Sequence, residues 1–298
     1  MSRIAFIGLG HMGGGMAANQ ARAQHHVSAF DLSADALAKA EANGCHPAVS
    51  GAEAVRDAEV VITMLPAGQH VRAVYGTDVL PHVAKGALLI DCSTIDVDSA
   101  RAVAADAEAA GFTFADAPVS GGIMAADAGT LTFMVGCPDA HFEAVKAALQ
   151  PMAKAVVHAG AAGAGQAAKI CNNMVLGVTM LGVCEAFALA ERLGLQPDRF
   201  FEIASQSSAQ SWSMNTYCPW PGVGPSTPAD RGYEGGFLTA LMLKDLKLAQ
   251  EAAARSGAAT PMGAQAEALF ALFDRMGYGG KDFSAVLQWL RGQPEALK

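Results

Sequence analysis

The feature that most constrains this chain is a glycine pattern close to its start. Residues 8–13 have the spacing G-x-G-x-x-G and read Gly8-Leu9-Gly10-His11-Met12-Gly13. An apolar run at residues 4–7, typical of a buried strand, precedes the pattern, and residues 12–24 have the apolar spacing of a helix. Glycines at these positions permit a tight turn, a close approach of the backbone to a ligand and close packing of the helix on the strand. Because the N-terminus of a helix attracts phosphates, the pattern predicts a dinucleotide site.

A carboxylate after the second predicted strand indicates which dinucleotide binds. Asp31 follows the apolar run 27–30, at the distance from the glycine pattern where such sites place an acidic residue. Its oxygens would accept hydrogen bonds from the hydroxyls of the adenosine ribose, and its charge would repel the 2′-phosphate of NADP. The sequence therefore predicts NAD as the cofactor. The alternative is that Asp31 only caps the following helix, although Ser33 is the better candidate for that cap.

The first 162 residues alternate short apolar runs with helical patterns. Runs rich in β-branched residues and without polar alternation are typical of parallel strands that are covered on both faces. Alternation of strands and helices is typical of a doubly wound α/β domain. We therefore predict a Rossmann-like NAD-binding domain over residues 1–162. Its further strands are predicted at 60–64, 88–90, 112–115 and 133–135, and its further helices at 34–43, 67–75 and 98–110.

Two of the predicted strands should end beside the cofactor. In an open parallel sheet, ligands lie beyond the carboxyl ends of the strands. Leu65 and Pro66 follow the strand at 60–64, and Thr94 follows the strand at 88–90. We expect Leu65 and Pro66 to lie along the cofactor and Thr94 to contact the nicotinamide ribose. Ordinary turns between strand and helix are the alternative for each of them.

From residue 163 onward the pattern is helical. Residues 165–192 carry apolar side chains almost all round, which predicts one long helix that is buried on most sides. Its most apolar stretch, residues 174–184, is too short to span a bilayer, which needs about 20 residues. We predict an all-helical domain for substrate binding and oligomerisation over residues 163–298. Its other helices are predicted at 197–206, 237–256, 261–276 and 282–290, with a proline-rich loop at 218–236.

Charge and cysteine usage exclude several classes of protein. The 298 residues carry 20 Lys and Arg against 28 Asp and Glu, a formal charge of -8, which argues against a nucleic-acid partner and an anionic membrane surface. The six cysteines form no C-x-x-C pair, which predicts small buried side chains in a reducing compartment. No signal-peptide pattern precedes the first strand. We predict a cytoplasmic protein without a metal site, because the eight histidines show no metal-ligand spacing.

Two segments carry polar groups that could perform chemistry. Ser120-Gly121-Gly122 follows a strand pattern and would expose successive backbone N–H groups, which suits a carboxylate ligand. Lys169 and Asn173 lie four residues apart and therefore share one face of the long helix. A lysine is costly to bury among the apolar neighbours of this helix, so its presence there indicates a function. The alternative is that Lys169 extends to solvent near the start of the helix.

Taken together, these motifs resemble those of the β-hydroxyacid dehydrogenase family, and within it those of the bacterial 3-hydroxyisobutyrate dehydrogenases. The resemblance covers nearly the whole chain. It rests on the glycine pattern, on residues 116–122, on residues 165–173, on Pro219-Trp220-Pro221-Gly222 and on Lys244-Asp245-Leu246. It implies NAD-dependent oxidation of 3-hydroxyisobutyrate to methylmalonate semialdehyde, as in valine catabolism.

The resemblance also implies a role for each candidate residue. Lys169 would be the general acid/base, and Asn173 would orient the substrate. Ser120, Gly121 and Gly122 would hold the substrate carboxylate, and Lys244 would reach the cofactor and the substrate. A lysine has an ordinary pKa of about 10.4, so the pKa of Lys169 must be lowered for it to accept a proton near neutral pH. Burial, the positive nicotinamide and Lys244 would all act in that direction, and oxidation should be favoured at alkaline pH.

The sequence leaves the substrate and the assembly open. Another small β-hydroxy acid, such as 3-hydroxypropionate, serine or glycerate, is the alternative substrate, and Trp212, Tyr217 and Phe237 are expected to line the pocket that decides. A reductase of glyoxylate, succinic semialdehyde or tartronate semialdehyde is a further alternative. A non-catalytic dinucleotide-binding module is the rival from a different class, and it would need neither Lys169 nor Asn173. Family analogy and the apolar helices predict a homodimer or homotetramer.

Overall fold

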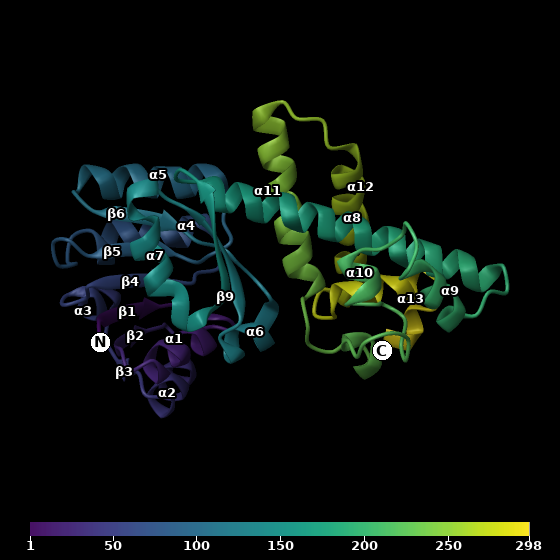
Figure 1. Cartoon of the computed structure of the whole chain (residues 1–298), viewed down its shortest axis with the longest axis horizontal. Coiled ribbons are helices and arrows are strands. Elements are labelled where there is room, and N and C mark those ends of the chain that lie inside the picture. The colour runs from purple at the N-terminus through teal and green to yellow at the C-terminus, as the bar shows by residue number, and fades with distance from the viewer. Residues whose placement is uncertain (298) are drawn as a thin grey trace. The chain divides into compact units, whose positions relative to one another are not determined.

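A computed structural model describes residues 1–297 and divides the chain into two compact units (Figure 1). The N-terminal unit comprises Met1–Lys169, and the C-terminal unit comprises Ile170–Lys298. The boundary falls inside one continuous helix, α8 (Ala164–Arg192). The two residues with the strongest claim to chemistry, Lys169 and Asn173, therefore lie on the same helix on either side of this boundary.

Nine strands of the N-terminal unit form one sheet: β1 (Arg3–Ile7), β2 (His26–Phe30), β3 (His46–Pro47), β4 (Val60–Thr63), β5 (Leu88–Asp91), β6 (Thr113–Asp116), β7 (Val119–Ser120), β8 (Leu131–Gly136) and β9 (Ala153–Gly160). Their order is β3-β2-β1-β4-β5-β6-β8-β7, with β9 beside β8. The strands from β3 to β6 are parallel, as the sequence predicts.

The far end of the sheet departs from the prediction of a parallel sheet. β8 runs antiparallel to β6 and to β7, whereas β9 runs parallel to β8. Residues 117–130 are used by the short strand β7 and by the helix α6 (Gly122–Ala128), and β8 returns in the opposite direction.

Helices cover both faces of this sheet: α1 (Gly13–Arg22), α2 (Ala34–Ala42), α3 (Gly51–Val55), α4 (Gly68–Val74), α5 (Val97–Ala109), α6 and α7 (Phe142–Leu149). Successive side chains of a strand point to opposite faces. Ile4 and Phe6 of β1 belong to a core shared with α1, α2 and α7, and Ala5 and Ile7 belong to a second core shared with α3, α4 and α5. This double covering confirms the doubly wound α/β fold and leaves the carboxyl ends of the strands available to a ligand.

The C-terminal unit is helical. It contains α8 from residue 170 onward, α9 (Pro197–Ala204), α10 (Trp212–Asn215), α11 (Thr239–Ser256), α12 (Pro261–Phe273) and α13 (Val286–Leu290). α11 and α12 run side by side (Figure 1). Within residues 170–297 the structure has no strand beyond an isolated bridge between Leu238 and Asp282. The predicted loop at 218–236 contains one short 3-10 turn, Pro228–Arg231.

Helix α8 is less buried than its sequence predicts. Its apolar stretch, with a mean hydropathy of 1.7, is long and apolar enough to cross a membrane, but the core helix of a folded domain has the same composition. Only 44% of this stretch is buried in the chain, and Val175 and Leu189 are 58% and 60% exposed. The prediction of a helix buried on most sides is therefore wrong for a single copy of the chain. One face packs on the core of the C-terminal unit, and the other carries exposed apolar side chains.

Candidate active site

The glycine pattern forms the turn from β1 into α1, and each glycine has a different environment. Gly8 has a φ of +96°, and a Cβ there would overlap the carbonyl oxygen of Met64. A Cβ on Gly13 would overlap the carbonyl oxygen of Gly8, so helix and strand pack as closely as predicted. By contrast, a Cβ on Gly10 would meet no atom of the chain within 4 Å. The protein itself requires Gly8 and Gly13, whereas the open space beside Gly10 fits a bound pyrophosphate.

Asp31 stands at the end of β2 and reaches back to the glycine turn. Its Oδ2 accepts a hydrogen bond from the Leu9 N–H at 2.7 Å, and its Oδ1 accepts one from the Ser33 N–H at 2.8 Å. Ser33, and not Asp31, caps α2 by accepting from the Ala36 N–H. Each carboxylate oxygen retains a second lone pair, so Asp31 can also accept the ribose hydroxyls of NAD.

One buried carboxylate links the two strand ends that were expected to edge the cofactor. The Leu65 N–H donates to Ser93 Oγ at 2.7 Å, and Ser93 Oγ donates to Asp91 Oδ1 at 2.6 Å. Thr63 Oγ1 donates to the same oxygen at 2.7 Å. The loops that carry Leu65 and Thr94 are therefore connected through Asp91.

The sequence did not predict that Asp91 and Ser93 connect these loops. Asp91 is fully buried, and burial raises the pKa of its carboxyl group to about 6, although hydrogen bonds from Ser93 and Thr63 oppose that shift. Its Oδ2 has no hydrogen-bond partner among residues 1–297. The available signal in the sequence was a run of polar residues, Asp91, Ser93 and Thr94, at the carboxyl end of β5.

The Ser120-Gly121-Gly122 segment turns sharply from β7 into α6. Gly121 and Gly122 have φ angles of +135° and +71°, a backbone shape that L side chains rarely adopt. A Cβ on Gly121 would lie 2.6 Å from the Cβ of Ala125. The geometry suits a small concavity of backbone N–H groups, and its use by a substrate carboxylate stays a prediction.

Lys169 is buried rather than directed to solvent. Its exposed fraction is 7%, and that of Asn173, one turn further along α8, is 2%. The alternative of a lysine that extends to solvent is therefore wrong. In the C-terminal unit, the Asn173 Nδ2 donates to Asp245 Oδ2 at 2.5 Å, and Lys244 Nζ lies 3.9 Å from Asp245 Oδ1. Asp245 thus brings together two of the predicted site residues, a role that its sequence position beside Lys244 did not reveal.

The predicted pocket aromatics gather around one carboxylate of the C-terminal unit. Trp212 is half exposed and stacks on Tyr217, with ring centres 4.5 Å apart. The Tyr217 hydroxyl and the Phe237 N–H both donate to Asp282 Oδ2 at 2.8 Å. The structure therefore places Trp212 and Phe237 in one cluster, and their contact with a substrate stays a prediction.

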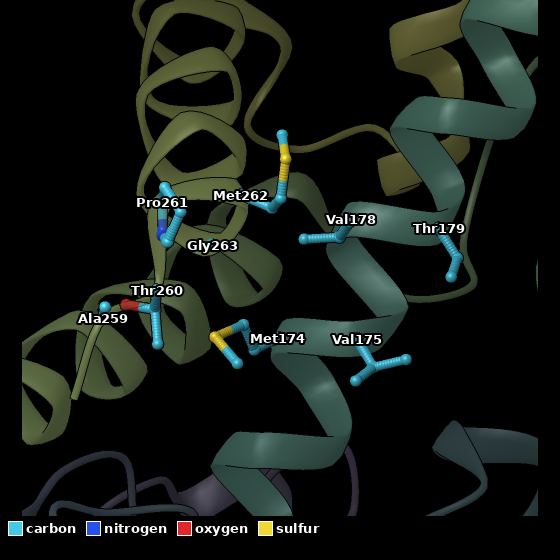
Figure 2. Close-up of a pocket in the computed structure, with 9 residues that line it drawn as sticks. All are labelled: Met174, Val175, Val178, Thr179, Ala259, Thr260, Pro261, Met262 and Gly263. Carbon is cyan, nitrogen blue, oxygen red and sulfur yellow. The ribbon is translucent and has the colours of Figure 1, made fainter.

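An apolar cavity of about 320 Å³ lies elsewhere in the C-terminal unit (Figure 2). Figure 2 shows Met174 and Val178 of α8 pointing toward the segment 259–263 that leads into α12. The lining is apolar apart from two threonines, Thr179 and Thr260. This composition does not suit the proton transfer assigned to Lys169, and none of the predicted site residues lines the cavity.

Comparison with known proteins agrees with this geometry. Residues 3–160 match the family described as the NAD binding domain of 6-phosphogluconate dehydrogenase, and residues 163–290 match the family described as NAD-binding of NADP-dependent 3-hydroxyisobutyrate dehydrogenase. A 3-hydroxyisobutyrate dehydrogenase of Pseudomonas aeruginosa is 49% identical over 98% of this chain and 100% of its own length. An NAD-dependent L-serine dehydrogenase of the same organism is 48% identical over 96% of this chain and 97% of its own.

A solved structure shows the same fold. The 3-hydroxyisobutyrate dehydrogenase of Mycobacterium tuberculosis with L-serine is 47% identical, has a TM-score of 0.94, and covers 98% of this chain and 99% of its own. The glycine turn and Asp31 fit NAD, and the relatives are named as dehydrogenases of small hydroxy acids. The chain therefore belongs to the β-hydroxyacid dehydrogenase family, where it resembles the bacterial 3-hydroxyisobutyrate dehydrogenases, and it is an NAD-dependent dehydrogenase.

Proposed function

We propose that this enzyme oxidises 3-hydroxyisobutyrate to methylmalonate semialdehyde, a step of valine catabolism. The observation that carries the proposal is the buried Lys169, one helical turn before the buried Asn173. The 49% identity to a 3-hydroxyisobutyrate dehydrogenase supports the choice of substrate. A non-catalytic dinucleotide-binding module would have no use for a lysine that is costly to bury.

The proposal assigns a role in the reaction to each candidate residue. Bound NAD would supply the hydride acceptor for the carbinol carbon. Lys169 Nζ takes the hydroxyl proton, and Asn173 orients the hydroxyl toward it. The backbone N–H groups of the Ser120-Gly121-Gly122 turn hold the substrate carboxylate. Lys244 serves both cofactor and substrate.

The cofactor contacts are part of the proposal. We infer that the glycine turn binds the pyrophosphate, that Asp31 binds the adenosine ribose, that Leu65 and Pro66 lie along the cofactor, and that Thr94 contacts the nicotinamide ribose. The residues of the glycine turn are Gly8, Leu9, Gly10, His11, Met12 and Gly13. The open space beside Gly10 and the hydrogen bond from Leu9 to Asp31 support this arrangement. Trp212 and Phe237 complete the substrate pocket. We place the functional division of the chain between residues 162 and 163; the first matching family ends at residue 160 and the second begins at residue 163, which supports this choice.

L-serine is the second candidate substrate. A relative that is 48% identical is named an NAD-dependent L-serine dehydrogenase, and the similar solved structure contains L-serine. Serine and 3-hydroxyisobutyrate differ in one group on the carbon beside the carboxylate, an ammonium in the first and a methyl in the second. An apolar wall there would favour the methyl by about 1–3 kcal/mol, and an acceptor for the ammonium would reverse the preference.

A substrate panel tests the proposal. NADH formation would be followed at alkaline pH with 3-hydroxyisobutyrate, L-serine, 3-hydroxypropionate and glycerate, each with NAD and with NADP. We expect the highest kcat/KM for 3-hydroxyisobutyrate with NAD. A higher kcat/KM for L-serine would replace the substrate and keep the chemistry, whereas NAD binding without turnover on any acid would favour a binding module.

We also propose a homodimer or homotetramer in the cytoplasm. The exposed apolar face of α8 and the apolar cavity next to it support pairing of two copies (Figure 2). The six cysteines are free, which supports a reducing compartment; five of them are buried as predicted, but Cys171 is exposed. Light scattering coupled to gel filtration should give a multiple of 30.6 kDa, and Val175→Glu should lower it. An unchanged mass for that variant would place the interface elsewhere.

A further inference from the structure

A buried carboxylate from the sheet holds the first turn of α8. Asp116 is the last residue of β6 and is fully buried. Its Oδ1 accepts from the Gly163 N–H at 2.6 Å, and its Oδ2 accepts from the Gln166 N–H at 2.8 Å. The first N–H groups of a helix have no partner inside the helix. At α8 they find one in a side chain that lies 47 and 50 residues earlier in the sequence.

Gln166 makes a second attachment from the same turn. Its side chain is fully buried, its Nε2 donates to the carbonyl oxygen of Ser93 at 2.7 Å, and its Oε1 accepts from the Ile95 N–H at 3.1 Å. These two partners flank Thr94 in the loop after β5. We call Asp116 and Gln166 together the clasp, because they join the first turn of α8 to the ends of β5 and β6.

The packing leaves the clasped turn no freedom toward the sheet. A Cβ on Gly165 would overlap the carbonyl oxygen of Met134 and would lie 2.7 Å from the carbonyl oxygen of Asp116. A Cβ on Gly136 would overlap the Asp116 carboxylate and would lie 2.8 Å from the Gly165 nitrogen. Steric contact and the hydrogen bonds of Asp116 therefore both hold the turn against the ends of β6 and β8.

Burial and hydrogen bonding act in opposite directions on the Asp116 carboxyl group. Burial raises the pKa of Asp116 to about 6, even though backbone N–H groups of Gly163, Gln166 and Gly165 favour the charged form. Above that pH the charged form is less favoured in the fold than in water, so the fold is less stable with the ionised carboxyl than with the neutral one.

We propose that Asp116 and Gln166 are positioning residues for Lys169, which follows Gln166 by three residues on the same helix. The inference rests on the proposed role of Lys169 as the proton acceptor. The clasp sets the rotation and the height of the first turns of α8, and through them the place of the lysine amine. A displacement of about 1 Å at a reacting group can cost about 10²-fold in rate.

A double-mutant cycle tests this proposal. Asp116→Asn keeps the size of the side chain but turns a donor toward one of the two helix N–H groups. We expect kcat to fall about 10²-fold, with the Kd for NAD and the thermal midpoint close to those of the wild type. In a Lys169→Ala background the same substitution should change the residual rate little, because no lysine remains to be displaced.

Two further variants test the same proposal if Asp116→Asn does not fold. Gln166→Met removes both attachments of that side chain without adding charge and should repeat the pattern. Gly165→Ala pushes the turn off the sheet without altering any polar group and should lower kcat in the same way. The matched control is Gly76→Ala, an exposed position of the same unit where a Cβ meets nothing within 4 Å.

The outcomes separate the two proposals. Wild-type kcat in Asp116→Asn and Gln166→Met, or an equal loss of rate with and without Lys169, overturns the positioning role and leaves the proposed function standing. Wild-type turnover of Lys169→Ala by itself overturns the proposed function and this inference with it. A loss of rate that vanishes in the Lys169→Ala background supports both.

Discussion

Two helices begin at the same sheet of the N-terminal unit, and their first turns are held in opposite ways. α1 begins at Gly13 without a side-chain cap, and its position is set by the backbone contacts of Gly8 and Gly13. The first turn of α8 is held by the side chains of Asp116 and Gln166. The start of α1 thus keeps N–H groups for the phosphates of a ligand, whereas the start of α8 has its N–H groups satisfied within the protein. The first turn of α1 is therefore available to a ligand, whereas the first turn of α8 is fixed by the protein itself.

The largest effect should come from removing the close packing at the start of α1. In Gly13→Ala the new Cβ overlaps the carbonyl oxygen of Gly8, so helix and strand must separate. We expect a loss of about 3 kcal/mol in the free energy of unfolding. Chemical denaturation measures it, with Gly76→Ala as the control. An unchanged midpoint would show that α1 tolerates the displacement. Close packing would then not be what holds the first turn of α1, and the comparison with α8 would fail.

Asp91→Asn should change the free energy of unfolding by a smaller amount, and should raise it. Asp91 pairs in register with Asp116 on the neighbouring strand. Burial raises the pKa of Asp91 from 3.8 to about 6, so its contribution to stability is present below the lower value and is lost as the pH rises through the higher one. Asp91→Asn keeps an acceptor for Ser93 and Thr63 and replaces the unpartnered Oδ2 with a neutral group. We expect a gain of about 2 kcal/mol at about pH 8 and little change at about pH 4.

Thermal midpoints at the two pH values measure this difference. Asp31→Asn provides the matched comparison, because Asp31 is only partly buried and donors surround both of its oxygens. If Asp91→Asn is destabilised at the higher pH, the carboxylate charge itself holds the cofactor loops together, and the cost assigned to its burial is wrong.

The smallest effect on the fold should come from Gly10. A Cβ there meets no atom of the chain within 4 Å, so Gly10→Ala should keep the stability of the wild type. We expect the Kd for NAD to rise about tenfold, or about 1.4 kcal/mol, because the methyl group occupies the space of the pyrophosphate. Calorimetric titration with NAD measures the change. Unaltered affinity would mean that the phosphates do not lie against this face of the turn.

The same contrast explains what could be predicted from the sequence. The start of α1 depends on residues that are adjacent in the chain, so Gly8, Gly13 and Asp31 were recognisable from spacing alone. The clasp joins residues that are 47 to 73 positions apart, and no local pattern reveals such a pair. Asp116 lies in the segment 116–122, on which the family resemblance rests. Its hydrogen bond to Gln166 of α8 could be recognised only from the three-dimensional structure.

The missed elements have similar causes. β9 (Ala153–Gly160) lies beside β8 and is mostly half exposed, with Val157 53% exposed, so it lacks the continuous apolar run that identified the inner strands. The buried residues of α7 (Phe142–Leu149), Val145 and Leu149, lie four residues apart. This apolar spacing is typical of a helix, so α7 could have been predicted from the sequence. The burial of α8 was overestimated because apolar composition does not tell whether the chain itself or a second copy covers a face.

The most direct test of the central claim compares wild type with Lys169→Ala on 3-hydroxyisobutyrate. Kinetics of NADH formation and the Kd for NAD would be measured on the same preparations, with thermal midpoints to show that both are folded. A positioned acid/base contributes about 10²–10⁴-fold, so kcat should fall by at least that factor while NAD still binds. Turnover of Lys169→Ala close to that of the wild type would contradict the account, because the buried lysine would then have no part in the chemistry.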